Sequence, residues 1–236
     1  MLDKKDVSET LKTVREAERK ILTEYESKNI LSEMEIPVIE TVLVNSKLEA
    51  VEVARRLKYP VVMKVSSPDI TSRSEAEAIR VGLTSELEVR QAFEDIRINA
   101  RSYRSEADVK GVVVQKYVPN ALEVVIRITQ DESFGPTVVF SIGGVWTDFL
   151  QDISYRLAPV SKSDAGEMIK EIEGYPVLLG SGEGNPVDVS ALEDIIHKIS
   201  QIPEEYEDIL EVSLDPVFAL EEGKGATVVD ARIELK

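Results

Sequence analysis

Apolar positions recur with two different periods along this chain, and each change of period separates a predicted helix from a predicted strand. Over residues 7–34 they return every three or four positions among Glu, Lys and Arg, which is the spacing of a helix with one buried face. We expect one long helix there, broken near residues 26–29 and ended before Pro37, because the residue before a proline leaves the helical region. Asn45-Ser46 and Ser85 are expected to cap two later helices. The same spacing predicts further helices at residues 48–57, 85–104, 162–172 and 189–199.

Short runs of β-branched and aromatic residues, bounded by Gly, Pro, Asn or Ser, predict the strands. They lie at residues 41–44, 59–65, 79–83, 111–118, 122–129, 209–218 and 226–233. Only residues 119–121 separate the fourth run from the fifth, so we expect these two strands to form an antiparallel hairpin. Helices and strands in this order predict an α+β (α/β) chain with mixed or antiparallel sheets, and 236 residues are enough for two lobes.

The stretch 131–159 places polar side chains at the ends of apolar strands, where a rigid scaffold can present them to a ligand. A Phe-Gly-Pro turn begins it, a Gly-Gly pair interrupts it and Pro159 closes it. Asp148 and Arg156 both have apolar neighbours in the sequence. One interpretation is a buried ion pair, and the other is support of a metal and contact with a phosphate. We favour the second interpretation.

The composition argues against several classes of protein. With 28 Lys and Arg against 44 Asp and Glu the net charge is −16, so the field of the molecule repels nucleic acid and anionic membranes. The absence of cysteine fits a reducing cytoplasm. The first residues lack the apolar core of a signal peptide, and no apolar run approaches the roughly 18 residues of a membrane span. We expect a soluble, cytoplasmic protein that binds neither nucleic acid nor membrane. A small anion such as a nucleotide stays compatible with this charge, if local Lys, Arg or a divalent cation compensates it.

Three residues carry candidate binding chemistry. Lys64 lies in an apolar strand, where a lysine is costly to bury unless an anion meets it; the alternative is a strand-edge lysine that reaches solvent. Asp215 precedes a proline at a strand end, and Asp230 interrupts an apolar run. Two carboxylates on paired strands suit magnesium, although each alone is equally typical of a turn or cap. The glycine-rich loop at residues 180–184 is either an anion cradle or an ordinary connection.

Five runs together carry a resemblance. They are LTEYESKNILSEMEIPV, YPVVMKVSSPDI, VVVQKYVPNALEV, FGPTVVFSIGGVWTDFLQDISYRLAP and NPVDV, at residues 22–38, 59–70, 112–124, 134–159 and 185–189. In combination they resemble the β subunit of ADP-forming acyl-CoA (acetyl-CoA) synthetase, an ATP-grasp family related to the β subunit of succinyl-CoA synthetase. The resemblance implies an ATP-grasp fold whose two α+β lobes hold a nucleotide between them. It also implies a helical segment at residues 1–45 packing on the second lobe, a small lobe at 46–118 and a large lobe at 119–236.

The resemblance further implies roles for individual residues. The expected nucleotide-binding residues are Lys64, Thr71, Ser72, Arg73, Gln115, Val118 and Glu123. Within this set Lys64 contacts the phosphates, residues 71–73 cover them, and Gln115 with Val118 frames the adenine. The expected magnesium positions are Asp215 and Asp230, with Asp148 in support. Arg156 joins Lys64 in neutralising the charge of the transferred phosphate.

One segment departs most from the family pattern. The family usually carries His-Lys-Ser-Asp followed within two residues by Gly-Gly, where this chain has SRSEAEA at residues 72–78. That histidine relays phosphate in the acyl-CoA synthetases, and Ser72 cannot form a phosphohistidine. Glu77 and Ala78 stand in place of the glycines that let the segment approach phosphate closely. The only histidine, His197, lies on a predicted helix, where a structural role is expected.

The leading hypothesis is the nucleotide-binding β subunit of an ADP-forming acyl-CoA synthetase. Such a subunit transfers phosphate between a phosphohistidine of a partner subunit and ADP or ATP (acyl-CoA + ADP + phosphate = acid + CoA + ATP). It requires Mg²⁺, ATP or ADP, and a CoA-binding α subunit, in an expected assembly of two α and two β subunits (α2β2). The main alternative is a non-catalytic ATP-grasp paralogue with a structural or regulatory role. A stand-alone ATP-dependent carboxylate ligase is a third.

Overall fold

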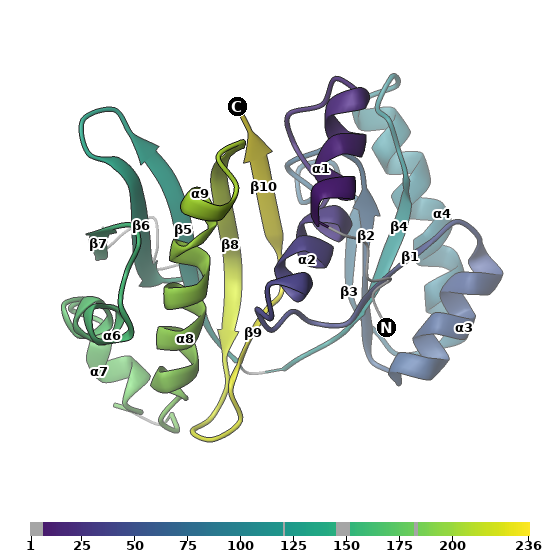
Figure 1. The fold of residues 1–236 in the computed structure, drawn as a ribbon. Coiled ribbons are helices and arrows are strands. Elements are labelled where there is room, and N and C mark those ends of the chain that lie inside the picture. Colours follow the sequence, from purple (N-terminus) through teal and green to yellow (C-terminus); the bar gives the residue numbers. More distant parts are fainter. Residues whose placement is uncertain (1–6, 120, 145–151, 182–183) are drawn as a thin grey trace. The chain divides into compact units, whose positions relative to one another are not determined.

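Two compact units make up the chain in the computed structural model, and each unit is built on its own antiparallel sheet (Figure 1). The first unit comprises Met1–Asn29 and Ile39–Pro119, and the second comprises Ile30–Val38 and Asn120–Lys236. The structure describes residues 7–119, 121–144, 152–181 and 184–236. The α+β class with antiparallel sheets is therefore confirmed. The division into a helical segment and two lobes with boundaries near residues 45 and 118 stays a prediction.

The first unit has a four-stranded sheet in the order β1-β4-β2-β3. Its strands are β1 (Thr41–Val44), β2 (Val61–Ser66), β3 (Ile79–Leu83) and β4 (Gly111–Lys116). Its helices are α1 (Val7–Glu16), α3 (Lys47–Leu57), α4 (Glu86–Tyr103) and the first part of α2 (Glu24–Glu33). The hydroxyls of Ser46 and Ser85 accept hydrogen bonds from backbone amides three residues later. The predicted caps of α3 and α4 are thus confirmed.

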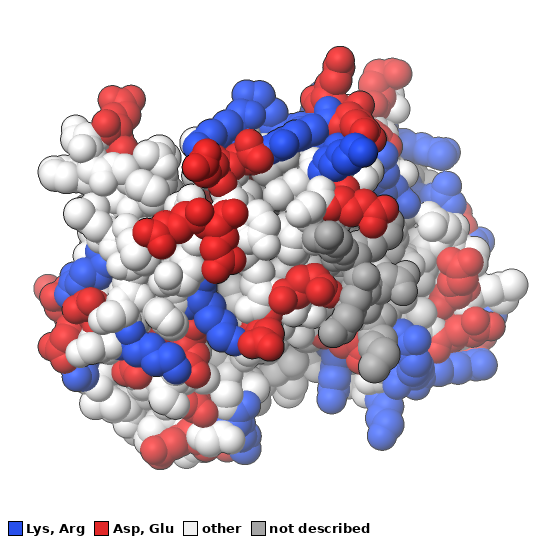
Figure 2. All heavy atoms as spheres, viewed as in Figure 1, with Lys and Arg blue, Asp and Glu red and all other residues white. Residues whose placement is uncertain are grey.

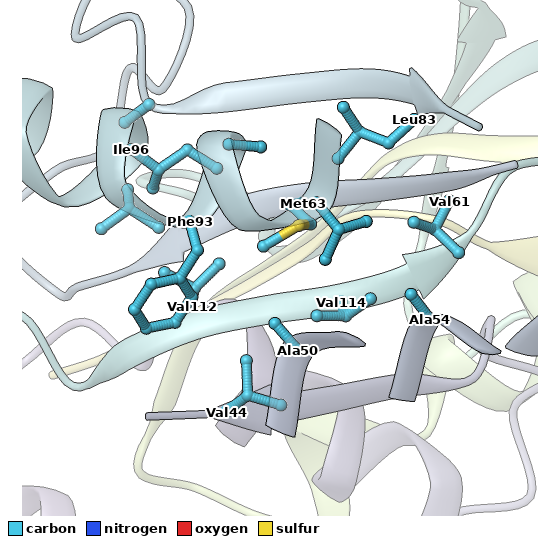
Figure 3. Close-up of a cluster of buried hydrophobic side chains, with 14 of the residues drawn as sticks. Val44, Ala50, Ala54, Val61, Met63, Leu83, Phe93, Ile96, Val112 and Val114 are labelled. Atoms are coloured by element: carbon cyan, nitrogen blue, oxygen red, sulfur yellow. The ribbon is translucent and has the colours of Figure 1, made fainter. Parts of the chain in front are cut away.

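The core of the first unit lies between this sheet and the helices α3 and α4. Figure 3 shows Phe93 and Ile96 of α4 among valines of the strands, close to Met63 of β2. Each such side chain contributes about 1.5–3 kcal/mol when fully buried. Because successive side chains of a strand point to opposite faces, Met63 and Val65 face this core and Lys64 faces the other side of the sheet.

The hairpin expected between residues 111–118 and 122–129 is wrong. β4 lies inside the first sheet, hydrogen-bonded to β1 on one side and to β2 on the other. β5 (Leu122–Asp131) belongs to the second sheet. Since β4 already has two neighbours, no edge is left for β5, and its unbroken valine run is that of a fully buried central strand.

The second unit has a six-stranded sheet in the order β10-β8-β5-β6-β7, with β9 paired to β8. Besides β5, its strands are β6 (Gly135–Ile142), β7 (Ile153–Leu157), β8 (Ile209–Ala219), β9 (Ala226–Val228) and β10 (Ala231–Leu235). Its helices are α6 (Lys162–Lys170), α7 (Tyr175–Leu178), α8 (Val189–Ser200) and α9 (Ile202–Glu205), together with the end of α2. The strand expected at residues 226–233 is split in two at Asp230.

Helices α6 and α8 cover one face of the second sheet (Figure 1). Ile126, Ile128 and Phe140 are almost completely buried. Arg127 lies between the two isoleucines in β5, so its side chain points to the opposite face. There it is paired in register with Val139 of β6. This opposite face carries one of the predicted metal ligands, described below.

The helix expected over residues 7–34 is two helices, and the break lies before Glu24 rather than at residues 26–29. At the end of α1, Glu18 adopts a φ of 52°, and the amide of Arg19 donates to the carbonyl of Val14 at 3.1 Å. This is the hydrogen-bond pattern of a Schellman end, in which one left-handed residue stops the helix. Apolar spacing alone does not reveal such a stop, since the periodic pattern resumes in α2.

Charged side chains lie mostly at the surface of the described residues. On the face shown in Figure 2, acidic and basic groups are interspersed and do not form one continuous basic area. Three charged residues are exceptions, because Glu24, Lys28 and Lys64 are buried. Among the described helices none is long and apolar enough to cross a bilayer.

Candidate functional site

Glu24 is the first residue of α2, and local hydrogen bonds fix this end of the helix. The hydroxyl of Thr23 accepts from the amide of Glu26 at 3.2 Å, and the Glu26 carboxylate accepts from the amide of Thr23 at 2.8 Å, which is a capping box. Arg19 donates two hydrogen bonds to the same carboxylate, of 3.0 and 2.7 Å. Burial raises the pKa of Glu26, but the hydrogen bonds from Arg19 and Thr23 outweigh burial and hold this pKa below its usual value. Glu24 is thereby held where the helix dipole favours a negative charge.

The Glu24 carboxylate has cations at both of its oxygens. Lys28, one turn further along α2, donates to Oε1 at 2.6 Å, and Lys64 donates to the same oxygen at 3.1 Å. An Arg73 guanidinium nitrogen lies 3.2 Å from Oε2. We call these four residues the Glu24 cluster. The Lys64 side chain is only 5% exposed, so the strand-edge alternative is wrong, and one of its anionic partners is a carboxylate of the protein itself.

The cluster keeps Glu24 ionised despite its depth. Burial raises the pKa of Glu24, but the positive charges of Lys28, Lys64 and Arg73 lower this pKa by more, so that it lies far below the usual 4.5. A buried carboxylate without such partners takes up a proton instead. The four charges therefore persist in a surrounding of low dielectric constant, where the attraction of a cation for a further anion is stronger than in water.

Arg73 reaches the cluster from residues 72–78, which form a compact turn and not an open loop. Three backbone hydrogen bonds of 3.1, 3.0 and 2.8 Å close it. Glu77 ends the turn at a φ of 47°, a conformation that glycine adopts without strain. The change from glycine to glutamate noted in the sequence thus falls on a position that favours glycine, and the turn forms nevertheless. Thr71 is exposed and Ser72 is half-buried.

Gln115 lies on the same face of the first sheet as Lys64. Its side-chain oxygen accepts a hydrogen bond from Lys28 at 3.0 Å, and the hydroxyl of Thr41 lies 3.0 Å from the same nitrogen. Lys28 thus ties α2 to β1 and β4. The structure brings Gln115 into contact with the Glu24 cluster, while Val118 follows the end of β4 and is half-buried.

Asp215 and Asp230 come together in the second unit. The amide of Asp215 donates to the carbonyl of Asp230 at 3.2 Å, beside the paired strands β8 and β10. The Asp215 carboxylate accepts a hydrogen bond from Arg127 of β5 at 2.6 Å. Sequence reasoning missed Arg127. The available signal was a lone cation within the alternating β5 run, at a position that faces away from the covering helices.

The donor set of Asp215 and Asp230 suits magnesium. Within the described ranges, no three His, Cys, Asp or Glu side chains gather as a metal site. In nucleotide sites, however, magnesium is bound by only one or two carboxylates, because phosphate oxygens and water complete its octahedron. Two aspartates on adjacent backbone segments are compatible with this requirement, and their binding of magnesium stays a prediction. Asp148, expected in support, lies outside the described residues.

Glu123 contacts the first residue of the Gly143-Gly144 pair. The amide of Gly143 donates to the carbonyl of Glu123 at 2.7 Å, and a Cβ on Gly143 would lie 3.0 Å from the Glu123 Cβ. Gly144 follows at a φ of 73°. The first glycine is thus needed for a close approach and the second for its backbone conformation. Together they let the chain pass over a half-buried Glu123.

Arg156 pairs with Glu171, the residue that caps the end of α6. One guanidinium nitrogen donates to Oε2 at 2.8 Å and the second nitrogen donates to Oε1, so the contact is bidentate. These hydrogen bonds raise the pKa of Arg156 and lower the pKa of Glu171. The two side chains are 28% and 53% exposed, so this is a partly exposed ion pair. Contact of Arg156 with phosphate stays a prediction.

His197 and the glycine-rich loop carry less of the chemistry. Nδ1 of His197 lies 2.7 Å from the carbonyl of Val160, which agrees with the expected structural role. In the loop, Gly180 packs against the backbone of Pro186, and residues 182–183 lie outside the described part of the chain. Nothing described in this loop forms an anion cradle.

The chain matches the family model of the ATP-grasp domain over residues 13–235, so the two sheets and their helices define an ATP-grasp protein. Acetate–CoA ligase (ADP-forming) I subunit beta of Pyrococcus furiosus is 41% identical over 219 residues, which cover 93% of this chain and 94% of that protein. This chain belongs to the family of the β subunits of ADP-forming acetate–CoA ligases. The family and ligase-subunit hypotheses are confirmed.

Solved structures agree with this assignment. A structure of the dinucleotide forming acetyl-coenzyme A synthetase 1 of Ca. Korarchaeum cryptofilum matches with a TM-score of 0.93 at 39% identity, covering 98% of this chain and 100% of that chain. A second structure of that enzyme matches with a TM-score of 0.85 at 37% identity and the same coverage, 98% and 100%. It is described as a complex with coenzyme A and Mg-AMPPCP, with the phosphohistidine segment pointing towards the nucleotide binding site.

Proposed function

We propose that this chain carries out the nucleotide half-reaction of an ADP-forming acyl-CoA synthetase. In the direction of ATP formation, the bond between phosphorus and a histidine nitrogen of a partner subunit breaks, and a bond to an oxygen of the β-phosphate of ADP forms. The overall reaction is acyl-CoA + ADP + phosphate = acid + CoA + ATP. Because Ser72 cannot carry a phosphoryl group as a histidine does, the phosphohistidine is supplied directly by the partner.

The observation that carries this proposal is the Glu24 cluster. Phosphoryl transfer requires little covalent chemistry from a protein and depends on positioning and on neutralising negative charge. Lys64 and Arg73 come from a strand and from a separate turn, yet both lie within 3.2 Å of the same carboxylate. Two cations held this close together are suited to contact a nucleotide phosphate. Gln115 and Val118 would frame the base, and Glu123 would contact the nucleotide.

Asp215 and Asp230 would hold Mg²⁺. The ion would supply positive charge that offsets the charge of the phosphates during transfer. The part of the protein is to set the ligands: Arg127 orients the Asp215 carboxylate at 2.6 Å, and the backbone hydrogen bond fixes Asp215 beside Asp230. Binding of Mg-AMPPCP by the Korarchaeum relative supports this choice of cofactor.

A CoA-binding α subunit is the proposed partner, in an assembly of two α and two β subunits. The name of the Pyrococcus relative, a subunit beta, supports a second subunit. The phosphohistidine segment recorded for the Korarchaeum enzyme supports delivery of the phosphoryl group to the nucleotide by such a segment. In this scheme the chain is inactive alone.

The second candidate is a non-catalytic ATP-grasp subunit. Ser72 in place of the relay histidine favours it, as does Glu77 at a position of positive φ that suits glycine. A carboxylate on this turn also adds negative charge to the segment that is expected to cover the phosphates. The two candidates differ in whether the chain binds Mg-ADP and supports transfer.

Calorimetry with Mg-ADP tests the proposal. We expect the wild-type chain to bind with a submillimolar dissociation constant, and Lys64→Met to weaken binding about 10- to 100-fold, the effect of losing a hydrogen bond to a charged group. Lys47→Met is the matched control, since Lys47 forms an exposed ion pair with Glu94. Absence of Mg-ADP binding up to the millimolar range would favour the non-catalytic subunit. Co-purification with the α subunit, followed by an assay of acyl-CoA-dependent ATP formation, then tests catalysis.

A further inference from the structure

Glu24 has no role in the chemistry proposed so far, although it is the residue on which the cluster converges. Its side chain has no exposed surface. Oε1 accepts from Lys28 at 2.6 Å and from Lys64 at 3.1 Å, while Oε2 faces Arg73 at 3.2 Å. The three cations come from three different segments: Lys28 from α2, Lys64 from β2 and Arg73 from the turn at residues 72–78.

We propose that Glu24 is a positioning residue for the phosphate-contacting cations, holding Lys64 and Arg73 on its two oxygens so that both can meet the same phosphoryl group. The inference rests on the proposed function, in which Lys64 meets a nucleotide phosphate. The geometry supports it because nitrogens of Lys64 and Arg73 lie 3.1 and 3.2 Å from the two oxygens of one carboxylate, close enough together to contact two oxygens of one phosphoryl group. Glu24 therefore links the turn to β2 before any nucleotide arrives.

Stability alone does not explain the cluster. A buried ion pair is often no more stabilising than well-packed apolar residues, because each charge loses its hydration. Lys28 by itself would neutralise Glu24, as an i,i+4 pair within one helix. Lys64 and Arg73 add further buried charge at the same carboxylate. Their contacts with it hold β2 and the turn at residues 72–78 in a fixed position relative to each other.

Contacts on two sides hold the start of α2, which carries Glu24. The capping box and Arg19 fix the start of α2 from one side, while Lys28 reaches Thr41 and Gln115 on the sheet from the other. Glu24 is ionised at any physiological pH, since the neighbouring cations hold its pKa far below 4.5. Its negative charge is therefore present throughout the working range of an enzyme.

Glu24→Gln tests the proposal, because glutamine keeps the size of the side chain and removes its charge. The measured quantities are the dissociation constants of Mg-ADP, by calorimetry, and of adenosine, by NMR titration. We expect the Mg-ADP constant to rise about 10- to 100-fold and that of adenosine, which has no phosphate, to change by less than about twofold. Glu33→Gln is the matched control on the same helix: Glu33 is exposed at the end of α2, outside the cluster, and Mg-ADP binding should stay at the wild-type level.

In Glu24→Gln the buried Lys28 loses its anionic partner, which can prevent folding. A double variant tests the inference in that case. Glu24→Gln/Lys28→Met replaces the innermost ion pair with an uncharged pair, a change that proteins often tolerate. The same selective loss of Mg-ADP affinity is expected. The inference is overturned if a folded variant, checked by circular dichroism, binds Mg-ADP within about twofold of wild type, or loses adenosine affinity to the same degree.

If wild type itself fails to bind Mg-ADP, or Lys64→Met has no effect, the proposed function fails. If Lys64→Met weakens binding and the Glu24 variants do not, only this inference fails.

Discussion

The backbone amide of Asp215 donates a hydrogen bond to the carbonyl oxygen of Asp230 at 3.2 Å. Asp215 lies in β8 and Asp230 immediately precedes β10, at the end of the β8–β10 ladder. Their proximity follows from the interruption of the last apolar run at Asp230, which splits it into β9 and β10. The backbone thereby places the two aspartates beside each other, and Arg127 contacts the Asp215 carboxylate.

Asparagine at either position should weaken the binding of magnesium and so raise the magnesium concentration that nucleotide binding requires. For Asp215→Asn or Asp230→Asn, we expect the Mg²⁺ concentration that half-saturates ADP binding to rise about 10-fold or more, because a neutral amide is a poorer magnesium ligand than a carboxylate. Titration of ADP binding with MgCl₂ measures this. Asp194→Asn is the control, since Asp194 forms an exposed ion pair with Lys162. An unchanged Mg²⁺ requirement in both variants would exclude this pair as the metal site.

Variants of Arg156 and of Glu171 distinguish a structural role of Arg156 from contact with phosphate. Arg156→Gln and Glu171→Gln disrupt the same ion pair, but only the first removes the positive charge. If Arg156 neutralises the transferred phosphate, Arg156→Gln should slow ATP formation by the complete enzyme, and Glu171→Gln should not. Rates at saturating ADP measure the difference. Both variants should unfold at nearly the wild-type temperature, because a partly exposed pair contributes little to stability. Equal rates in the two variants would confine Arg156 to holding β7 against α6.

The stability of the first unit should depend on pH through Glu24. The pKa of Glu24 is lower in the folded chain than its usual 4.5, so its ionised form stabilises the fold above pH 4.5, and this contribution is lost as the pH falls below that value. Glu24→Gln should therefore be less stable than wild type at neutral pH by about 3–5 kcal/mol, the effect of breaking a buried pair, and the difference should shrink in acid. Urea unfolding at pH 7 and pH 3.5 measures it. A difference that is the same at both pH values would contradict an ionised Glu24.

A glycine at the end of α2 should stabilise the chain. Glu35 follows this helix at a φ of 57°, and the amide of Ile36 donates to the carbonyl of Leu31 at 2.9 Å, which is the left-handed helix end that favours glycine. Relief of about 1–2 kcal/mol of strain, less the greater entropy of an unfolded glycine, predicts a gain of about 0.5–1 kcal/mol for Glu35→Gly. In contrast, Glu33 is the last residue of α2 and is not in the left-handed conformation, so Glu33→Gly should cost up to about 1 kcal/mol. Urea unfolding of the two variants should show opposite signs.

Local patterns predicted most elements, and α2 shows where they fail. Apolar spacing predicts the helix, but it does not predict that four polar residues of the helix are buried: Glu24, Ser27, Lys28 and Asn29. Burial here depends on partners distant in sequence, since Lys28 meets Gln115 and Glu24 meets Lys64. The sequence does contain the sign of a helix start, Thr23 followed three residues later by Glu26, and this capping box would have placed the break correctly.

Long-range pairing was beyond the sequence patterns. The valine run of β4 predicts a strand, but its neighbours β1 and β2 precede it by several elements, and the short connection after it favours a hairpin with β5 that the fold does not contain. Lys64 illustrates the same limit in the site. Its need for an anionic partner followed from its apolar surroundings, whereas the identity of Glu24 as one partner required the fold.

The path of the chain between its two units bears on how a newly made copy folds. Ile30–Val38 belongs to the second unit although the residues on both sides of it belong to the first. Within the second unit, the amide of Val228 in β9 donates to the carbonyl of Pro37 at 2.8 Å. On the ribosome, the four strands of the first sheet are all available once β4 has emerged, so that this sheet can form while later residues are still being added. Residues 30–38 must meanwhile wait, tethered at both ends, until β9 has been made.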